Sequence, residues 1–280
     1  LASSRGNSIG LLVAELDGAF FGEMMAGVES ELRAAGKHII VTTGHSIEEK
    51  EKEGIEFLIS RNCDAIILHV EAVSDEYLVE LSKGNTPIFI ISRYVEHLSD
   101  QCISLDNELG GYLATKSLLE LGHKNIACIA GPQHKYDAKA RFKGYKRALR
   151  EYDIPFNESL FYTADFKETG GSEAIAQLIN RQQTFTGLVC GNDEMASGAM
   201  TYAREHGLSL PDDLSVVGFD DVIFARYIHP KLTTMLNPVN EMGKMAAKLV
   251  LKQVYQAKEL QIQQVFKPSL ILRESTKTAN

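Results

Sequence analysis

The stretch IGLLVAELDGAFFGEM (Ile9–Met24) contains the unit from which the whole chain is built. Its first six residues, Ile9–Ala14, are mostly apolar and include β-branched side chains, a composition typical of a buried strand. A polar turn follows at Asp17–Gly18, and the paired aromatics Phe20 and Phe21 come at the start of an amphipathic segment. The stretch therefore predicts a β-strand, a turn and an α-helix, in that order.

Similar apolar runs recur along the chain, with helix-like segments between them. In chain order, the runs of a first and a second series are Ile9–Ala14, His38–Thr43, Ala65–His69 and Ile88–Ile91, then Ile126–Ala130, a weaker Leu160–Thr163, Gly187–Cys190 and Ser215–Phe219. The spacing leaves room for one helix between successive strands, which favours a mostly parallel sheet with helices on both faces. We therefore expect two α/β arrays in tandem.

Three segments belong to neither series. Cys102–Gly111 predicts a strand that runs into a helix start at Asp106–Asn107, and Leu232–Gly243 predicts a strand followed by a helix at about Asn240–Tyr255. Val265–Arg273 predicts one final strand. These pieces are too small for a third domain, so we expect them to be exchanged between the arrays, which gives two lobes joined by several crossing strands.

The composition indicates a folded protein that does not hold nucleic acid by charge. The chain has 280 residues, of which 44% are hydrophobic, and its net charge of −8 repels phosphate backbones on average. It has no apolar run of the roughly 18 residues that a membrane helix needs, so we expect no membrane partner. The cysteines lie far apart in apolar runs, which favours reduced thiols and a cytoplasmic location; they are Cys63, Cys102, Cys128 and Cys190.

The residues that follow the predicted strands are the candidate binding residues, because open α/β sheets bind ligands beyond the carboxyl ends of their strands. They are Asp17, Phe20, Phe21, Arg93, Asp137, Arg141, Asn192, Asp220 and Asn237. A guanidinium can hold two oxygens at once, carboxylates and amides satisfy hydroxyls, and an aromatic face packs against a sugar ring. The set predicts a small polyhydroxylated ligand, and we expect a sugar.

Several of these residues also have a structural alternative. One of the two phenylalanines could anchor the core, and Arg141 could be a solvated surface residue. Asn237 could be a turn residue that is restricted by the proline after it. Asp193 and Asp221, which lie beside candidate residues, are explained equally well as helix N-caps.

Motifs for catalysis are missing from the sequence. It has no dinucleotide, P-loop, zinc-protease or serine-hydrolase signature and no His or Cys spacing typical of a metal site, so we expect no cofactor and no metal. Asp17 and Asp220 could act as an acid–base pair on a sugar. Orienting a ligand requires the same residues and no shifted pKa, so binding is favoured over catalysis.

Three motifs that occur in order resemble one protein family. They are GFDD (Gly218–Asp221), HPKLTTM (His229–Met235) and PSLILREST (Pro268–Thr276), and the likeness extends over essentially the whole chain. On these motifs the chain resembles the lac/galactose repressor family of bacterial transcription regulators, most of all its galactose-repressor branch. Gly18-Ala19 departs from the D-P-F-F type of turn found in many members of that branch.

The resemblance implies a periplasmic-binding-protein-like effector domain with two doubly wound lobes joined by three crossing strands. We expect one lobe to comprise residues 1–105 with 237–263, and the other 106–236 with 264–280. By the family's pattern, a galactose-like monosaccharide in the cleft between the lobes contacts all the candidate residues except Asp17, which the changed turn displaces. The family also implies a cytoplasmic homodimer that binds operator DNA through a helix-turn-helix segment, which this sequence lacks before Leu1.

Two alternatives remain open. A transport receptor of the same fold would bind a sugar for a membrane permease, and a signal peptide upstream of Leu1 would favour it. A sugar-acting α/β enzyme would use Asp17, Asp193 or Asp220, and turnover of a sugar would favour that alternative.

Overall fold

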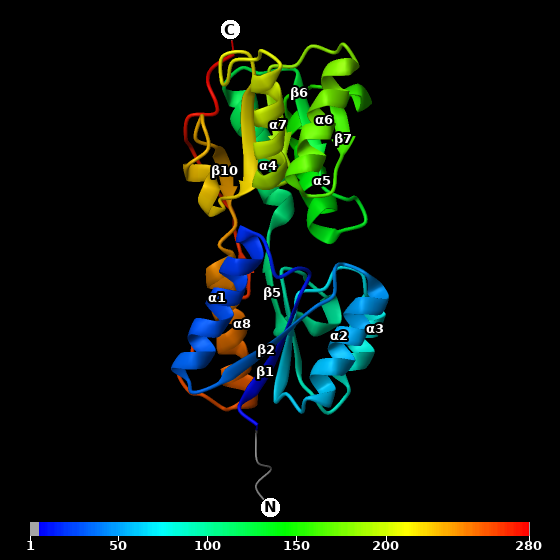
Figure 1. The fold of residues 1–280 in the computed structure, drawn as a ribbon, viewed down its shortest axis with the longest axis vertical. Helices are drawn as coiled ribbons and strands as arrows, with labels where there is room; N and C mark the ends of the chain where they lie inside the picture. The colour runs from blue at the N-terminus through cyan, green and yellow to red at the C-terminus, as the bar shows by residue number, and fades with distance from the viewer. Residues whose placement is uncertain (1–5, 280) are drawn as a thin grey trace, which may run out of the picture. The chain divides into compact units, whose positions relative to one another are not determined.

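The computed structural model describes residues 6–279, and the chain divides into two compact units. Unit 1 comprises Leu1–Leu105 and Pro238–Phe266, and unit 2 comprises Asp106–Asn237 and Lys267–Asn280. The chain therefore passes from one unit to the other three times, as the colours along the ribbon show (Figure 1).

Unit 1 is a six-stranded sheet with helices on both faces (Figure 1). The strand order is β11-β5-β4-β3-β1-β2, and the paired neighbours are parallel. Its elements are β1 (Ser8–Val13), α1 (Ala19–Ala34), β2 (His38–Thr43), α2 (Glu48–Ser60), β3 (Ala65–Leu68), α3 (Asp75–Ser82), β4 (Ile88–Ile91), the 3-10 turn Glu96–Gln101, β5 (Cys102–Leu105), α8 (Val239–Val254) and β11 (Val265–Phe266).

Unit 2 repeats this arrangement with the order β12-β10-β9-β8-β6-β7, in which only β12 runs antiparallel to its neighbour. Its elements are α4 (Asn107–Glu120), β6 (Ile126–Ala130), α5 (Tyr136–Glu151), the 3-10 turn Glu158–Leu160, β7 (Phe161–Thr163), α6 (Glu168–Asn180), β8 (Gly187–Cys190), α7 (Asp193–Glu205), β9 (Ser215–Asp220), the 3-10 turn Ile223–Arg226, β10 (Thr233–Leu236) and β12 (Ser269–Ile271). The strand order reverses at β6, which lies between β7 and β8, so the switch point of this sheet lies between β6 and β8.

The predicted fold class is confirmed: each unit is a doubly wound α/β sheet, and three strand-bearing segments connect the two. Strands β2, β4, β6 and β8 begin and end at the residues predicted for them. The helix start at Asp106 is also confirmed, because its carboxylate accepts a hydrogen bond of 2.9 Å from the backbone N–H of Leu109.

The prediction of one strand over Val265–Arg273 is wrong. The segment forms β11, which pairs with β5 in the first sheet, and β12, which pairs with β10 in the second. Pro268 lies between them and has no N–H to donate to a strand partner, so the run cannot continue. Residues 264–266 therefore lie in unit 1, whereas the expected boundary falls between 263 and 264; at another crossing, Asn237 lies in unit 2, one residue beyond the expected boundary.

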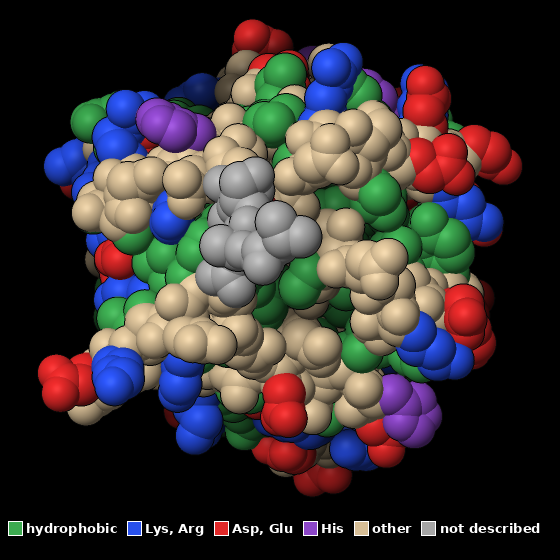
Figure 2. Space-filling view, turned by 90° about the horizontal axis from the view of Figure 1, so that it is seen from below, with side chains coloured by type: hydrophobic (Ala, Val, Ile, Leu, Met, Phe, Trp, Pro, Cys, Tyr) green, Lys and Arg blue, Asp and Glu red, His purple; other side chains and the backbone are tan. Residues whose placement is uncertain are grey.

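Aliphatic side chains fill the space between each sheet and its helices, and all four cysteines are free and buried among them. No helix within residues 6–279 is long and apolar enough to cross a membrane. Figure 2 shows one face of the molecule, on which both basic and acidic side chains lie around the rim.

Candidate functional site

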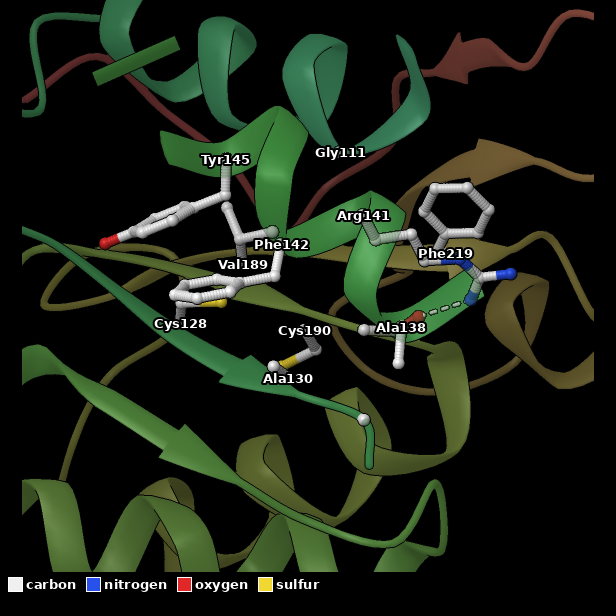
Figure 3. A pocket seen from close by; sticks show the side chains of 12 residues that line it. Gly111, Cys128, Ala130, Ala138, Arg141, Phe142, Tyr145, Val189, Cys190 and Phe219 are labelled. Carbon is white, nitrogen blue, oxygen red and sulfur yellow. Dashed lines mark hydrogen bonds between the residues drawn. The ribbon is translucent and has the colours of Figure 1, made fainter. Parts of the chain in front are cut away.

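Arg141 is buried near the carboxyl ends of the unit 2 strands, and two hydrogen bonds hold its guanidinium there. It lies on α5, is only 7% exposed, and donates from Nε to Asn107 Oδ1 at 2.9 Å and from Nη1 to the carbonyl oxygen of Gly191 at 2.6 Å. These two bonds hold the guanidinium against the ring of Phe219, whose centroid lies 3.7 Å from Cζ (Figure 3). The side chain is therefore pre-oriented, so a ligand need not fix its rotamer.

Asp220 lies opposite this guanidinium at the end of β9. Its Oδ1 is 3.5 Å from Arg141 Nη2 and accepts a hydrogen bond of 3.0 Å from the amide nitrogen of Asn237. Asp137, one turn before Arg141 on α5, places its Oδ2 3.6 Å from the same Nη2. Unit 2 thus brings together four of the residues predicted from the sequence, contributed by α5, β9 and the end of β10.

Burial controls the charge of Asp220. Desolvation raises the pKa of its carboxyl to about 6, although Arg141 and the hydrogen bond from Asn237 act in the opposite direction. At neutral pH the group is a carboxylate and can accept hydrogen bonds from hydroxyls.

The amide oxygen of Asn237 has unused hydrogen-bonding capacity. Asn237 is 5% exposed, and its Oδ1 accepts no hydrogen bond from the residues that the structure describes. A buried acceptor without a donor costs free energy. A hydroxyl that donates to this oxygen would remove that cost.

Phe166 supplies an aromatic face that the sequence analysis missed. Its ring lies so close to Gly131 that a Cβ there would approach a ring carbon to 2.1 Å, and its centroid is 5.9 Å from Arg141 Cζ. The sequence does contain a signal for Phe166, because this residue comes shortly after the weak strand β7, as other candidate residues come after their own strands.

Asn192 makes two hydrogen bonds within the protein, and its contact with a ligand stays a prediction. Its Oδ1 accepts a hydrogen bond from Met195 N, which makes it the N-cap of α7, and its amide nitrogen donates to the carbonyl oxygen of Phe166. Both bonds hold the edge of the site. The neighbouring Asp193 is fully buried and is not the cap.

A second group of predicted residues lies in unit 1. Phe20 and Phe21, on the first turn of α1, pack edge to face with a centroid distance of 5.3 Å, and both contact the ring of His69. His69 is buried, and its Nδ1 has no hydrogen-bond partner within residues 6–279. The predicted strand Ala65–His69 included His69, which was therefore not among the candidate residues. In the structure His69 lies one residue past the end of β3.

Arg93 and Asp17 also lie in unit 1, and their contact with a ligand stays a prediction. Arg93 is buried, donates to Val73 O at 2.9 Å, and forms an ion pair of 2.5 Å with Asp75, so its guanidinium holds the loop after β3. The same loop donates three successive backbone N–H groups, those of residues 71–73, to the buried carboxylate of Glu51. Asp17 is exposed in the turn before α1.

A cavity of about 20 Å³ lies between α5 and strands β6 and β8, beside Arg141 (Figure 3). Its lining is mostly apolar and includes Cys128, Tyr145 and Phe219. Burial raises the pKa of the Cys128 thiol to about 12, so this cysteine is neutral and unreactive at physiological pH. No cluster of three or more potential metal ligands occurs in the part of the chain that the structure describes.

Comparison with known proteins places this geometry in a family. The family model of the periplasmic binding protein-like domain matches residues 115–276. The HTH-type transcriptional regulator GalR of Salmonella typhimurium (strain SL1344) is 35% identical over 278 residues, which cover 99% of this chain and 81% of the relative.

The comparison with solved structures points to the same family. A sugar-binding transcriptional regulator of the LacI family from Escherichia coli, complexed with phosphate, superposes with a TM-score of 0.88 at 27% identity and covers 98% of this chain and 100% of the other. A LacI family regulator from Enterococcus faecium with bound ribose gives 0.84 at 30% identity, with coverage of 98% and 100%. The chain therefore belongs to the lac/galactose repressor family of transcriptional regulators, and its two α/β units form the periplasmic-binding-protein-like effector core of that family.

Proposed function

We propose that this core binds a galactose-like monosaccharide as its effector, with the cluster Asp137, Arg141, Asp220 and Asn237 as the polar half of the site. The observation that carries the proposal is the buried, unsatisfied Oδ1 of Asn237 beside the carboxylate of Asp220 and the guanidinium of Arg141. Adjacent sugar hydroxyls can donate to the two oxygens and accept from the guanidinium.

Aromatic residues support a sugar over a more highly charged ligand. Phe166 lies at the edge of the cluster, and Phe20 and Phe21 follow the first strand of unit 1. An aromatic ring packs well on the C–H face of a pyranose. The bound ribose of the Enterococcus faecium regulator is a monosaccharide held by a chain of the same family.

We further propose that the sugar is bound without being altered, and that its binding changes operator affinity in a cytoplasmic homodimer. A ligand that contacts one arrangement of the lobes better than another shifts the population toward that arrangement. Membership of a family of transcriptional regulators supports this view.

Titration of the purified protein with a panel of monosaccharides tests the proposal. Calorimetry should give a saturable isotherm for galactose or a close epimer, with one site per chain, and chromatography should recover the sugar unchanged. Absence of binding across hexoses and pentoses would refute the sugar site. A product that disappears in Asp220→Asn would instead establish an enzyme.

A further inference from the structure

The turn that presents Asp220 has unusual backbone geometry. Asp220 and Asp221 have φ values of 107° and 53°, so two successive residues with side chains adopt positive φ. Such conformations are disfavoured for residues with a Cβ and persist when surrounding contacts hold them. The contacts that hold this turn therefore determine where the carboxylate of Asp220 points.

Asp221 is anchored by an ion pair that the proposed function does not use. Its side chain is 5% exposed, and its Oδ1 accepts from Arg273 Nη2 at 2.5 Å. Arg273 is itself fixed: Nη1 donates to Leu232 O at 2.8 Å, and its backbone N–H donates to Thr233 Oγ1 at 2.9 Å. The pair is rigid on both sides, unlike an exposed salt bridge.

Asp193 holds the next residue of the turn. Its Oδ2 accepts from the backbone N–H of Val222 at 2.9 Å, and its Oδ1 accepts from the hydroxyl of Thr234 at 2.5 Å. The turn is therefore fixed at Asp221 and at Val222, while the carboxylate of Asp220 is left to face Arg141 and Asn237.

We infer that Arg273 is a positioning residue for the ligand site, acting through Asp221 to hold the Asp220 carboxylate in its binding orientation. Arg273 lies in the segment Lys267–Asn280, which enters unit 2 at the third crossing of the chain and adds β12 beside β10. The ion pair therefore connects the ligand-binding turn to the segment that follows this crossing. The inference rests on the proposed sugar site, which it deepens.

A double-mutant cycle with galactose as the probe tests the inference. Arg273→Gln should weaken binding about tenfold, as expected for neighbours that share one network. In an Asp220→Asn background the same substitution should leave the remaining affinity unchanged, because the group that it positions has been replaced. Affinities are measured by calorimetry with the fraction of active sites determined, so that partial unfolding is not read as weaker binding.

Arg226→Gln is the matched control, since Arg226 Nη2 lies 3.5 Å from Oδ2 of Asp221, the carboxylate that Arg273 also contacts, but the Arg226 side chain is 55% exposed. It should bind as the wild type does. If Arg273→Gln does not fold, Arg273→Lys takes its place in the cycle, because it keeps the charge and loses the fork that spans Asp221 and Leu232.

Each possible outcome of the double-mutant cycle either supports or overturns the inference that Arg273 positions Asp220. Equal losses from the Arg273 substitution with and without Asp220→Asn would show a merely structural role and overturn it. Wild-type affinity in the Arg273 variant would also overturn it while leaving the sugar site intact. Failure of the wild type to bind galactose or any other monosaccharide would remove the sugar site and the positioning role together.

Discussion

The guanidinium of Arg141 lies 3.5 Å from the carboxylate of Asp220, and both side chains are about 8% exposed. The two groups come from α5 and β9, which are separated by two strands and two α-helices in the chain. At this distance the guanidinium and the carboxylate do not use up each other's hydrogen-bonding capacity. Each can therefore serve a ligand that enters between them.

Replacing Arg141 should abolish high-affinity binding. Arg141→Ala removes a charged donor from the site and leaves the buried carboxylate of Asp220 without its cation, so we expect a loss of about 3 kcal/mol in binding free energy. Calorimetry with the preferred sugar measures it. Arg147→Ala is the control, because Arg147 lies on the same helix but pairs with Glu108 away from the site. Near wild-type affinity in Arg141→Ala would contradict the site.

Removing the aromatic face should weaken binding without preventing folding. Phe166→Ala deletes the ring beside Arg141, and we expect a loss of about 1 to 2 kcal/mol in sugar affinity because stacking on the C–H face is lost. The measurement is the same titration, with Tyr152→Ala as the control, since Tyr152 is an exposed aromatic at the far end of α5. Equal effects of the two substitutions would argue against a stacking role.

Sugar affinity should rise with pH through the titration of Asp220. Burial raises the pKa of this carboxyl to about 6, and only its charged form accepts hydrogen bonds at both oxygens. Titrations between about pH 5 and pH 7 should show tighter binding at the higher pH. Asp220→Asn should bind weakly with no such dependence, and an unchanged pH profile in that variant would assign the titration to another group.

The same group should make the folded protein less stable as pH rises. Because the folded state raises the pKa of Asp220 above the usual value of 3.8, it binds more protons than the unfolded state between about pH 4 and pH 6. The free energy of unfolding contributed by Asp220 therefore falls across that window. Burial also raises the pKa of Asp193, so the wild type alone does not isolate Asp220. The test is the difference in the free energy of unfolding between the wild type and Asp220→Asn, measured with urea across this pH window.

Close helix contact should make Gly144 intolerant of a side chain. A Cβ at Gly144 of α5 would lie 2.0 Å from the carbonyl oxygen of Glu108 on α4, which is backbone and cannot rotate away. Gly144→Ala should lower the free energy of unfolding by about 3 kcal/mol and shift Arg141 on the same helix. The control is Gly22→Ala in α1, where no atom lies within 4 Å; it should be neutral or slightly stabilising.

Local sequence was sufficient for most of the strands and for the grouping of polar residues in unit 2. Runs such as Ile126–Ala130 and Gly187–Cys190 are apolar on both faces, as strands of a sheet covered by helices must be, so their limits could be predicted to the residue. Asp137, Arg141 and Asp220 lie close together, as expected for parallel strands that end at one edge of a sheet and for a helix that begins near that edge.

What the tertiary structure alone decided is which partner each polar group meets. The sequence does not tell which group each arginine meets: Arg93, in the loop after β4, is held by Val73 and Asp75, whereas Arg141, on α5, faces Asp220. In the same way, Val265–Arg273 has the composition of one strand, yet its two halves pair in different sheets. Periodicity and turn residues are set by neighbours a few positions away. Strand pairing and burial depend on segments that lie tens to more than a hundred residues distant, and a single sequence does not specify those contacts.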